Sequence, residues 1–329
     1  MGSPVGVVGP RALRALLSLD AFPFRLVDCS RGEADKPWMT GPRGAESSAG
    51  KCQSLHALLA ALEGEGKEGS KAASAAREAT VRFPVGGDVE DGDKGGLVFE
   101  EGTVAERATP LLMGIPAEAV AVVLDDDESK ARRVADTLAE AAGDSGRRIV
   151  VYAKGGGAAP AEAPPPAAFV SRHATKALQM RGRAVVVDLR RPEERERFGA
   201  IPGSLSLPVQ DVPLALGMSA DAFEAAYGFA REDKGGALLI LQCRTHRRSH
   251  WASVAFEEAG VRSALPGGER HAVLRDGVYG WKLDAVVQRY KGYDGPNHGV
   301  PEAEPFDVEA VDESAARTEL SELGISLST

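Results

Sequence analysis

Short segments made only of apolar residues alternate along this chain with longer segments of helical periodicity. In the first half, the pattern predicts helices at 9–19 and 128–143 and strands at 24–31 and 119–124. In the second half, it predicts helices at 171–180 and 249–260 and strands at 183–191 and 237–242. Strands without polar alternation are typical of parallel sheets that helices cover on both faces. The pattern therefore predicts an α/β fold for both halves.

The two halves also resemble each other. Each has an apolar strand followed by a helix that closes at a glycine, Gly143 in the first half and Gly260 in the second. Superposing these glycines gives an offset of 260 − 143 = 117 residues and places Asp126 opposite Cys243. We therefore expect two copies of one α/β domain, of which the first lacks the cysteine and is inactive. A chance match between two ordinary strand–helix units is the alternative.

A segment rich in Gly, Ala and Pro separates the halves and is typical of a linker. The expected organisation is a first, degenerate domain at 1–154, the linker at 155–168, an active domain at 169–290 and an acidic C-terminal tail at 291–329.

Charge and cysteine content narrow the class of protein. The formal net charge of −9 argues against a general nucleic-acid-binding protein, because such proteins are usually basic. No apolar run is long enough to span a membrane, so no membrane partner is expected. The three cysteines (Cys29, Cys52 and Cys243) form neither a disulfide framework nor a CxxC motif, so no metal is expected. A reducing compartment follows, and the cytoplasm is the prediction. Mitochondrial import is the alternative, because Arg11 and Arg14 lie among apolar residues.

Cys243 holds the most informative position, because it follows a predicted strand and precedes a predicted helix. Open α/β sheets place ligands at the carboxyl ends of their strands, and helix N-termini favour anions. A cysteine in this position is expected to ionise readily and to act as a nucleophile. Arg244, Arg247 and Arg248 add positive charge around it in an otherwise acidic protein, which indicates an anionic substrate. A solvated basic surface is the alternative.

Four segments of the second half have a distinctive composition and order: DLRRPEE at 188–194, AIPGSLSLP at 200–208, CRTHRRS at 243–249 and LRDGVYGW at 274–281. They resemble the D-x-R-x-P-x-E, H-I-P-G-A-x-x-x-P, C-R-x-G-x-R-S and G-G-x-x-x-W motifs of the rhodanese family. The segment 217–229 is similar to the single-domain thiosulfate sulfurtransferases of that family, including the glutathione-linked type. With the duplication, the resemblance implies tandem rhodanese-like domains.

The resemblance implies a sulfurtransferase with Cys243 as the nucleophile and a substrate-binding loop formed by Arg244, Thr245, His246, Arg247, Arg248 and Ser249. Sulfur from thiosulfate, or from another small anionic donor, would form a persulfide on Cys243. It would then pass to cyanide or to a thiol such as glutathione or thioredoxin. No cofactor is implied.

Three positions depart from the family pattern: His246 and Asp276 replace glycines, and Ala200 replaces a histidine. If the loop requires a positive φ at position 246, histidine is less favourable there than glycine, and the reaction would be slower.

Three alternatives stay open. The first is a cysteine-based phosphatase or arsenate reductase on the same fold, although phosphatases that resemble rhodaneses have a C-x5-R loop and this chain has C-x4-R. The second is a non-catalytic binding module. The third is a sulfur relay to a partner protein.

Overall fold

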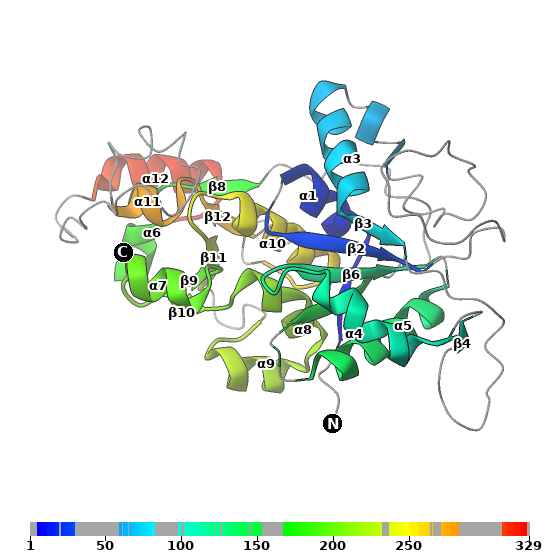
Figure 1. Cartoon of the computed structure of the whole chain (residues 1–329). Coiled ribbons are helices and arrows are strands. Elements are labelled where there is room, and N and C mark those ends of the chain that lie inside the picture. The colour runs from blue at the N-terminus through cyan, green and yellow to red at the C-terminus, as the bar shows by residue number, and fades with distance from the viewer. Residues whose placement is uncertain are drawn as a thin grey trace. The chain divides into compact units, whose positions relative to one another are not determined.

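The chain folds into two compact units, Met1–Ala163 and Pro164–Thr329 (Figure 1). The computed structural model describes residues 5–19, 21–29, 59–60, 62–64, 66–82, 98–99, 102–125, 127–143, 145, 147–152, 167–231, 237–263, 265, 271–282 and 311–327. The division between the units falls inside the segment predicted as a linker, most of which lies outside these residues.

The first unit contains a five-stranded parallel sheet in the order β1-β7-β6-β2-β3. Its strands are β1 (Gly6–Val8), β2 (Phe24–Asp28), β3 (Thr80–Arg82), β6 (Val120–Leu124) and β7 (Arg148–Tyr152). Its helices are α1 (Pro10–Leu19), α3 (Lys67–Ala79), α4 (Val104–Met113) and α5 (Glu128–Ala142). A separate antiparallel pair joins β4 (Val98–Phe99) to β5 (Gly102–Thr103). Side chains of α4 and α5 form one apolar core with β2, β6 and β7.

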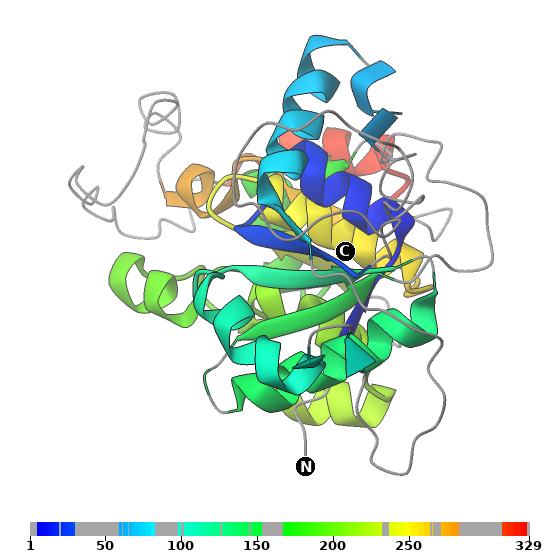
Figure 2. The same cartoon turned by 45° about the vertical axis from the view of Figure 1, so that its right-hand side comes forward.

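The second unit also contains a five-stranded parallel sheet, in the order β8-β12-β11-β9-β10. Its strands are β8 (Ala168–Val170), β9 (Ala184–Asp188), β10 (Leu205–Ser206), β11 (Leu238–Gln242) and β12 (Ala272–Leu274). Its helices are α6 (Arg172–Met180), α7 (Pro192–Phe198), the 3-10 turn η1 (Val209–Asp211), α8 (Val212–Gly217), α9 (Ala220–Tyr227), α10 (Arg247–Glu258), α11 (Gly277–Lys282) and α12 (Glu313–Glu322). Helix α10 runs along the sheet, where it contacts β11 and β12 (Figure 2).

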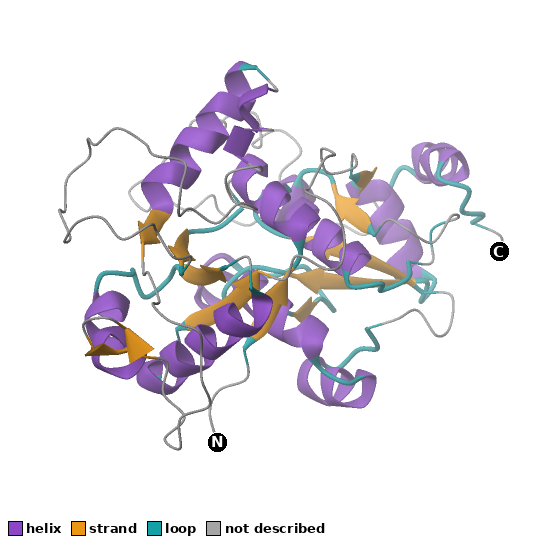
Figure 3. Ribbon diagram, turned by 90° about the vertical axis from the view of Figure 1, so that its right-hand side faces the viewer, coloured by secondary structure: helices purple, strands orange, loops and turns teal. Residues whose placement is uncertain are grey.

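The two sheets have the same strand order when their strands are numbered within each unit. Counting only the strands of each five-stranded sheet, the first, fifth, fourth, second and third lie side by side in both units. Helices accompany the strands of each sheet, as Figure 3 shows by colour. These observations confirm the predicted α/β fold with parallel sheets and flanking helices.

The sheet registers align the two units residue by residue. Asp28 pairs with Leu124 in the first unit, and Asp188 pairs with Gln242 in the second. The offset between the central strands is therefore 242 − 124 = 118 residues, and Asp125 occupies the place of Cys243. The glycine superposition predicted Asp126, which lies outside the described residues. The displacement is one residue because the closing glycine follows the central strand by 143 − 124 = 19 residues in the first unit and by 260 − 242 = 18 in the second.

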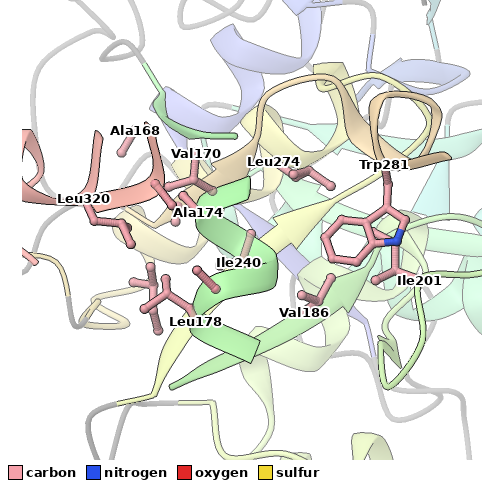
Figure 4. Packing of buried hydrophobic residues seen from close by; sticks show 14 of the residues in the cluster. Ala168, Val170, Ala174, Leu178, Val186, Ile201, Ile240, Leu274, Trp281 and Leu320 are labelled. Atoms are coloured by element: carbon pink, nitrogen blue, oxygen red, sulfur yellow. The ribbon is translucent and has the colours of Figure 1, made fainter. Parts of the chain in front are cut away.

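One face of the second sheet carries an apolar core with α6, α11 and α12. This cluster includes Val186 and Ile240 from the strands, with Trp281 from α11 at one end and Leu320 from α12 at the other (Figure 4). Ser171 caps the N-terminus of α6 by accepting from the N–H of Ala174. The capped helix then presents its apolar residues to this core.

The last described segment, 311–327, belongs to this core, whereas the sequence predicted only an acidic tail there. Helix α12 lies beside α6, and Ala316 and Leu320 are fully buried. Glu319 accepts a hydrogen bond of 2.8 Å from the N–H of Ser171, and Asp312 caps α12 through the N–H of Ala315. The acidic residues thus face solvent or cap helices while two apolar residues, one turn apart, pack inward.

Candidate active site

Cys243 lies at the junction predicted from the sequence, after the last residue of β11 and before α10. It is 1% exposed, and its Sγ lies 3.5 Å from the Oγ of Ser249. The same hydroxyl donates a hydrogen bond of 3.0 Å to the carbonyl of His246. A hydroxyl has one hydrogen, so Ser249 donates either to this carbonyl or to a Cys243 thiolate. The Ser249 hydroxyl thus contacts the sulfur and can donate to it when it does not donate to the His246 carbonyl.

Helix α10 begins at Arg247, two residues earlier than predicted, and its N-cap residue His246 makes no side-chain cap hydrogen bond. Helices α5, α6, α9 and α12, in contrast, are each capped by an Asp or Ser side chain. The first N–H groups of a helix have no acceptor within it, and they favour negative charge. The helix N-terminus nearest Cys243 thus has no side-chain acceptor from its own cap residue.

Arg248 forms an ion pair with Glu194 from α7. Its Nη1 and Nη2 donate to Oε2 and Oε1 at 2.6 Å and 2.8 Å. Burial alone would raise the pKa of Glu194, but the hydrogen bonds and charge of Arg248, with those of Arg191, lower it to about 2. Burial lowers the pKa of Arg248, but Glu194 and the nearby charges of Cys243 and Asp188 outweigh this effect and raise it. The guanidinium therefore lies within the electrostatic reach of the sulfur.

A buried network at the end of β9 fixes the position of α7. The carboxylate of Asp188 accepts from Arg190 Nε and Nη2 at 3.0 Å and 2.7 Å, and Arg195 Nη1 lies 3.1 Å from the same group. Arg190 also donates to the carbonyl of Gly199 at 2.8 Å. Asp188 is fully buried, so its role is to order this turn and, through it, the helix that carries Glu194.

His246 has a φ of −165°, which is extended backbone that any residue adopts. The loop therefore does not require glycine at this position, and the expected conformational cost of histidine is absent. The His246 ring meets Phe169 edge to face at 5.5 Å, and His250 meets the same ring at 6.3 Å. Partial burial, His250 and Arg247 lower the pKa of His246 against the opposing effects of Asp276 and Arg275.

The other residues of the loop occupy its outer part. The guanidinium of Arg244 lies over the ring of Tyr279 at 5.2 Å, Thr245 is half-buried and Arg247 is exposed. The segment after β12 closes against the loop, where the N–H of Val278 donates to the carbonyl of Cys243 at 2.9 Å. The predicted residues 243–246 thus form the loop, and 247–249 form the first turn of α10. Of the seven, Ser249 contacts the sulfur, and Arg248 interacts with it electrostatically.

The corresponding loop of the first unit has a different chemistry. Asp125 replaces Cys243, and Lys130 stands in the place of Arg248 by the same offset, 248 − 118 = 130. Asp125 Oδ2 lies 2.9 Å from Lys130 Nζ, and Asp127 caps α5 through the N–H of Ser129. The cation of this loop, Lys130, is therefore paired with the carboxylate of Asp125.

Other candidate groups lie elsewhere. Cys29 is buried at the end of β2, and His173 Nδ1 accepts from the N–H of Asp312. Cys52 lies outside the described residues. Within the part of the chain that the structure describes, no group of three or more His, Cys, Asp and Glu side chains could hold a metal ion. No helix there combines the length and apolarity needed to cross a membrane.

Two residues at this site were not singled out from the sequence. Glu194 pairs with Arg248, and Gly277 lies against the loop. Both lie in segments that resemble family motifs, at 188–194 and 274–281. The motifs signalled their presence, but neither spacing nor composition indicates which side chain reaches which loop.

Part of the chain is similar to known proteins. The model of the rhodanese-like domain family matches residues 171–284. Human thiosulfate:glutathione sulfurtransferase is 32% identical over 98 residues, which cover 30% of this chain and 84% of that protein. A rhodanese domain-containing protein of Drosophila melanogaster is 33% identical over 63 residues, covering 19% of this chain and 56% of the relative. The chain thus spans little more than half the length of that relative.

Among solved structures, the human single-domain sulfurtransferase is 28% identical and matches with a TM-score of 0.30, covering 36% of this chain and 98% of its own. The family match, residues 171–284, lies in the unit that holds Cys243, and the human thiosulfate:glutathione sulfurtransferase is matched over most of its own length. The chain therefore belongs to the rhodanese-like sulfurtransferase family.

Proposed function

We propose that the protein transfers sulfane sulfur through a persulfide on Cys243. The observation that carries the proposal is the placement of this thiol between the end of β11 and the uncapped start of α10, within reach of the Arg248 charge. A helix N-terminus and a guanidinium both stabilise an anion, as thiolate or as persulfide. Arg244, Thr245, His246 and Arg247 complete the proposed substrate-binding loop.

The proposed reaction has two displacement steps. The Cys243 thiolate attacks the outer sulfur of thiosulfate, the sulfur–sulfur bond of the donor breaks, and sulfite leaves with the bonding electron pair. An acceptor thiolate or cyanide then attacks the outer sulfur of the persulfide. This step forms an acceptor persulfide or thiocyanate and returns the Cys243 thiolate. Both steps are nucleophilic and require no organic cofactor or metal.

The burial of Cys243 supports a slim donor. A sulfur in a residue that is 1% exposed can be reached by a single terminal atom more readily than by a substituted phosphate. The C-x4-R loop is one residue shorter than the C-x5-R loop of phosphatases that resemble rhodaneses. It therefore also favours a small donor, and sulfur transfer over phosphatase activity. Thiosulfate and glutathione are the proposed donor and acceptor because the human relative is named for them. A cycle that depends on free thiols suits a reducing compartment, so the cytoplasm is the proposed location.

We further propose that the first unit is a degenerate copy without activity. The shared strand order of the two sheets supports a duplication, with domains at 1–154 and 169–290, and α12 completes the core of the second domain. The ion pair of Asp125 with Lys130 supports inactivity, because it supplies a carboxylate where the second unit has a thiol.

Thiocyanate formation from thiosulfate and cyanide tests both proposals in the full-length chain. Cys243→Ser should abolish it completely, whereas Cys29→Ser should retain it. Residual activity in Cys243→Ser would show a second nucleophile and contradict the inactivity of the first unit. Hydrolysis of an aryl phosphate by a wild type that transfers no sulfur would favour the phosphatase instead.

A further inference from the structure

Gly277 occupies an unusual position against the loop that follows Cys243. It has a φ of +58°, and a Cβ built on it would lie 2.5 Å from the carbonyl oxygen of Cys243. The same Cβ would lie 2.6 Å from the carbonyl oxygens of Arg244 and Thr245. Three successive carbonyls therefore converge on one glycine, and no other residue type fits there without moving the backbone.

This convergence fixes the direction of the loop amides. In a trans peptide the N–H points opposite to the C=O, and the described peptide bonds include no cis bond. The N–H groups of Arg244, Thr245 and His246 therefore point away from Gly277, toward the other side of the loop. Successive N–H groups on one side of a turn form a concave site for an anion.

A hydrogen bond holds this arrangement in place. The N–H of Val278 donates to the carbonyl of Cys243 at 2.9 Å, so the first turn of α11 is hydrogen-bonded to the loop. A Cβ at position 277 would push against peptide backbone, which cannot rotate away as a flexible side chain can.

We propose that Gly277 is a positioning residue that lets three loop carbonyls point toward it, so that the amides of residues 244–246 stabilise the anionic sulfur of Cys243. The inference rests on the proposed nucleophilic role of Cys243 and assigns the source of part of its stabilisation. Gly277 acts through the loop and touches no substrate.

Substitutions with alanine and asparagine separate this role from the need for a positive φ. Asparagine tolerates positive φ, but it carries the same Cβ as alanine. Gly182 provides the matched control, with a φ of +64° and no atom within 4 Å of an added Cβ. The full-length variants to compare are Gly277→Ala, Gly277→Asn, Gly182→Ala and Gly182→Asn.

The readouts are the pH dependence of Cys243 alkylation by iodoacetamide and the kcat and KM for thiosulfate. Both Gly277 variants should move the alkylation profile to higher pH by about one unit, the equivalent of one lost hydrogen bond to a charged group. Both should lower kcat/KM about tenfold or more. Both Gly182 variants should match the wild type. A wild-type alkylation profile in Gly277→Asn would overturn the proposal.

A measurement on the wild type covers the case in which the Gly277 variants do not fold. The amide nitrogen resonances of Arg244, Thr245 and His246 should move as pH is raised through the ionisation of Cys243, and stay fixed in Cys243→Ser. Resonances that do not respond in the wild type would overturn the proposal. Neither alkylation nor these resonances require turnover, so a wild type without sulfurtransferase activity would contradict the proposed function alone.

Discussion

The guanidinium of Arg248 and the carboxylate of Glu194 form a two-pronged ion pair that joins the start of α10 to α7. The same guanidinium lies near enough to Cys243 for the charge of the sulfur to contribute to its raised pKa. Glu194 and the sulfur thus share one cation, and Glu194 fixes where that cation stands. Substitutions at Arg248 and Glu194 can separate the effect of the charge on catalysis from the effect of the ion pair on stability.

Arg248→Ala should lower kcat/KM for thiosulfate by one to two orders of magnitude. One charge-assisted hydrogen bond to a partly buried anion is worth about 1.5–3 kcal/mol, and tenfold in rate corresponds to about 1.4 kcal/mol. Arg248→Lys should restore activity only in part, because an ammonium cannot form the planar two-pronged contact with Glu194. Steady-state kinetics give the answer. Arg262→Ala, an exposed change beyond α10, is the control and should behave as the wild type.

Glu194→Gln should lower the stability of the protein at neutral pH by about 3 kcal/mol. The pKa of Glu194 is about 2 against an ordinary value of 4.5, so the ionised form is favoured by the fold. This stabilisation is fully present above pH 4.5 and is lost as pH falls from 4.5 to 2. Urea unfolding across that range should show the loss in the wild type and not in Glu194→Gln. The adjacent exposed Glu193→Gln should leave the loss in place, and an unchanged pH dependence in Glu194→Gln would refute the assignment.

Ser249→Ala should slow sulfur transfer about tenfold, because the hydroxyl 3.5 Å from Sγ is then unavailable to the thiolate. Ser253 is one helical turn further along α10 and donates to the carbonyl of His250 at 2.7 Å, as Ser249 does to His246. Ser253→Ala therefore removes a comparable helix hydrogen bond away from the sulfur and should keep full activity. Equal loss in the two variants would assign the effect to the helix rather than to the sulfur.

His271 should make the protein sensitive to mild acid. It is fully buried beside Phe256, and burial lowers its pKa to about 4. Among the described residues, neither ring nitrogen has a hydrogen-bond partner. The unfolded chain takes up this proton near pH 6.5, so stability is complete above 6.5 and falls between 6.5 and 4, by up to about 3 kcal/mol. His271→Leu should abolish this slope in urea titrations, and a persisting slope would place the titrating group elsewhere.

The sequence sufficed to predict the strand–loop–helix that holds Cys243, because apolar strands and helical periodicity are local patterns. It did not indicate that Glu194 reaches Arg248, since 54 residues separate them and only the folded sheet brings α7 to α10. The sequence left the backbone conformation of His246 open for a similar reason: φ depends on how the loop lies against Gly277 and Val278. In α12, the capping residue Asp312 and the spacing of Ala316 and Leu320 were a usable signal that the acidic composition obscured.

The proposed reaction requires Cys243 to carry the transferred sulfur. The most direct measurement is the mass of the intact protein after incubation with thiosulfate and removal of excess donor, followed by mapping of the peptide that contains Cys243. The account predicts a gain of one sulfur atom on that peptide, reversed by cyanide and absent in Cys243→Ser. An unmodified Cys243, or a sulfur atom carried on any other residue, would contradict it.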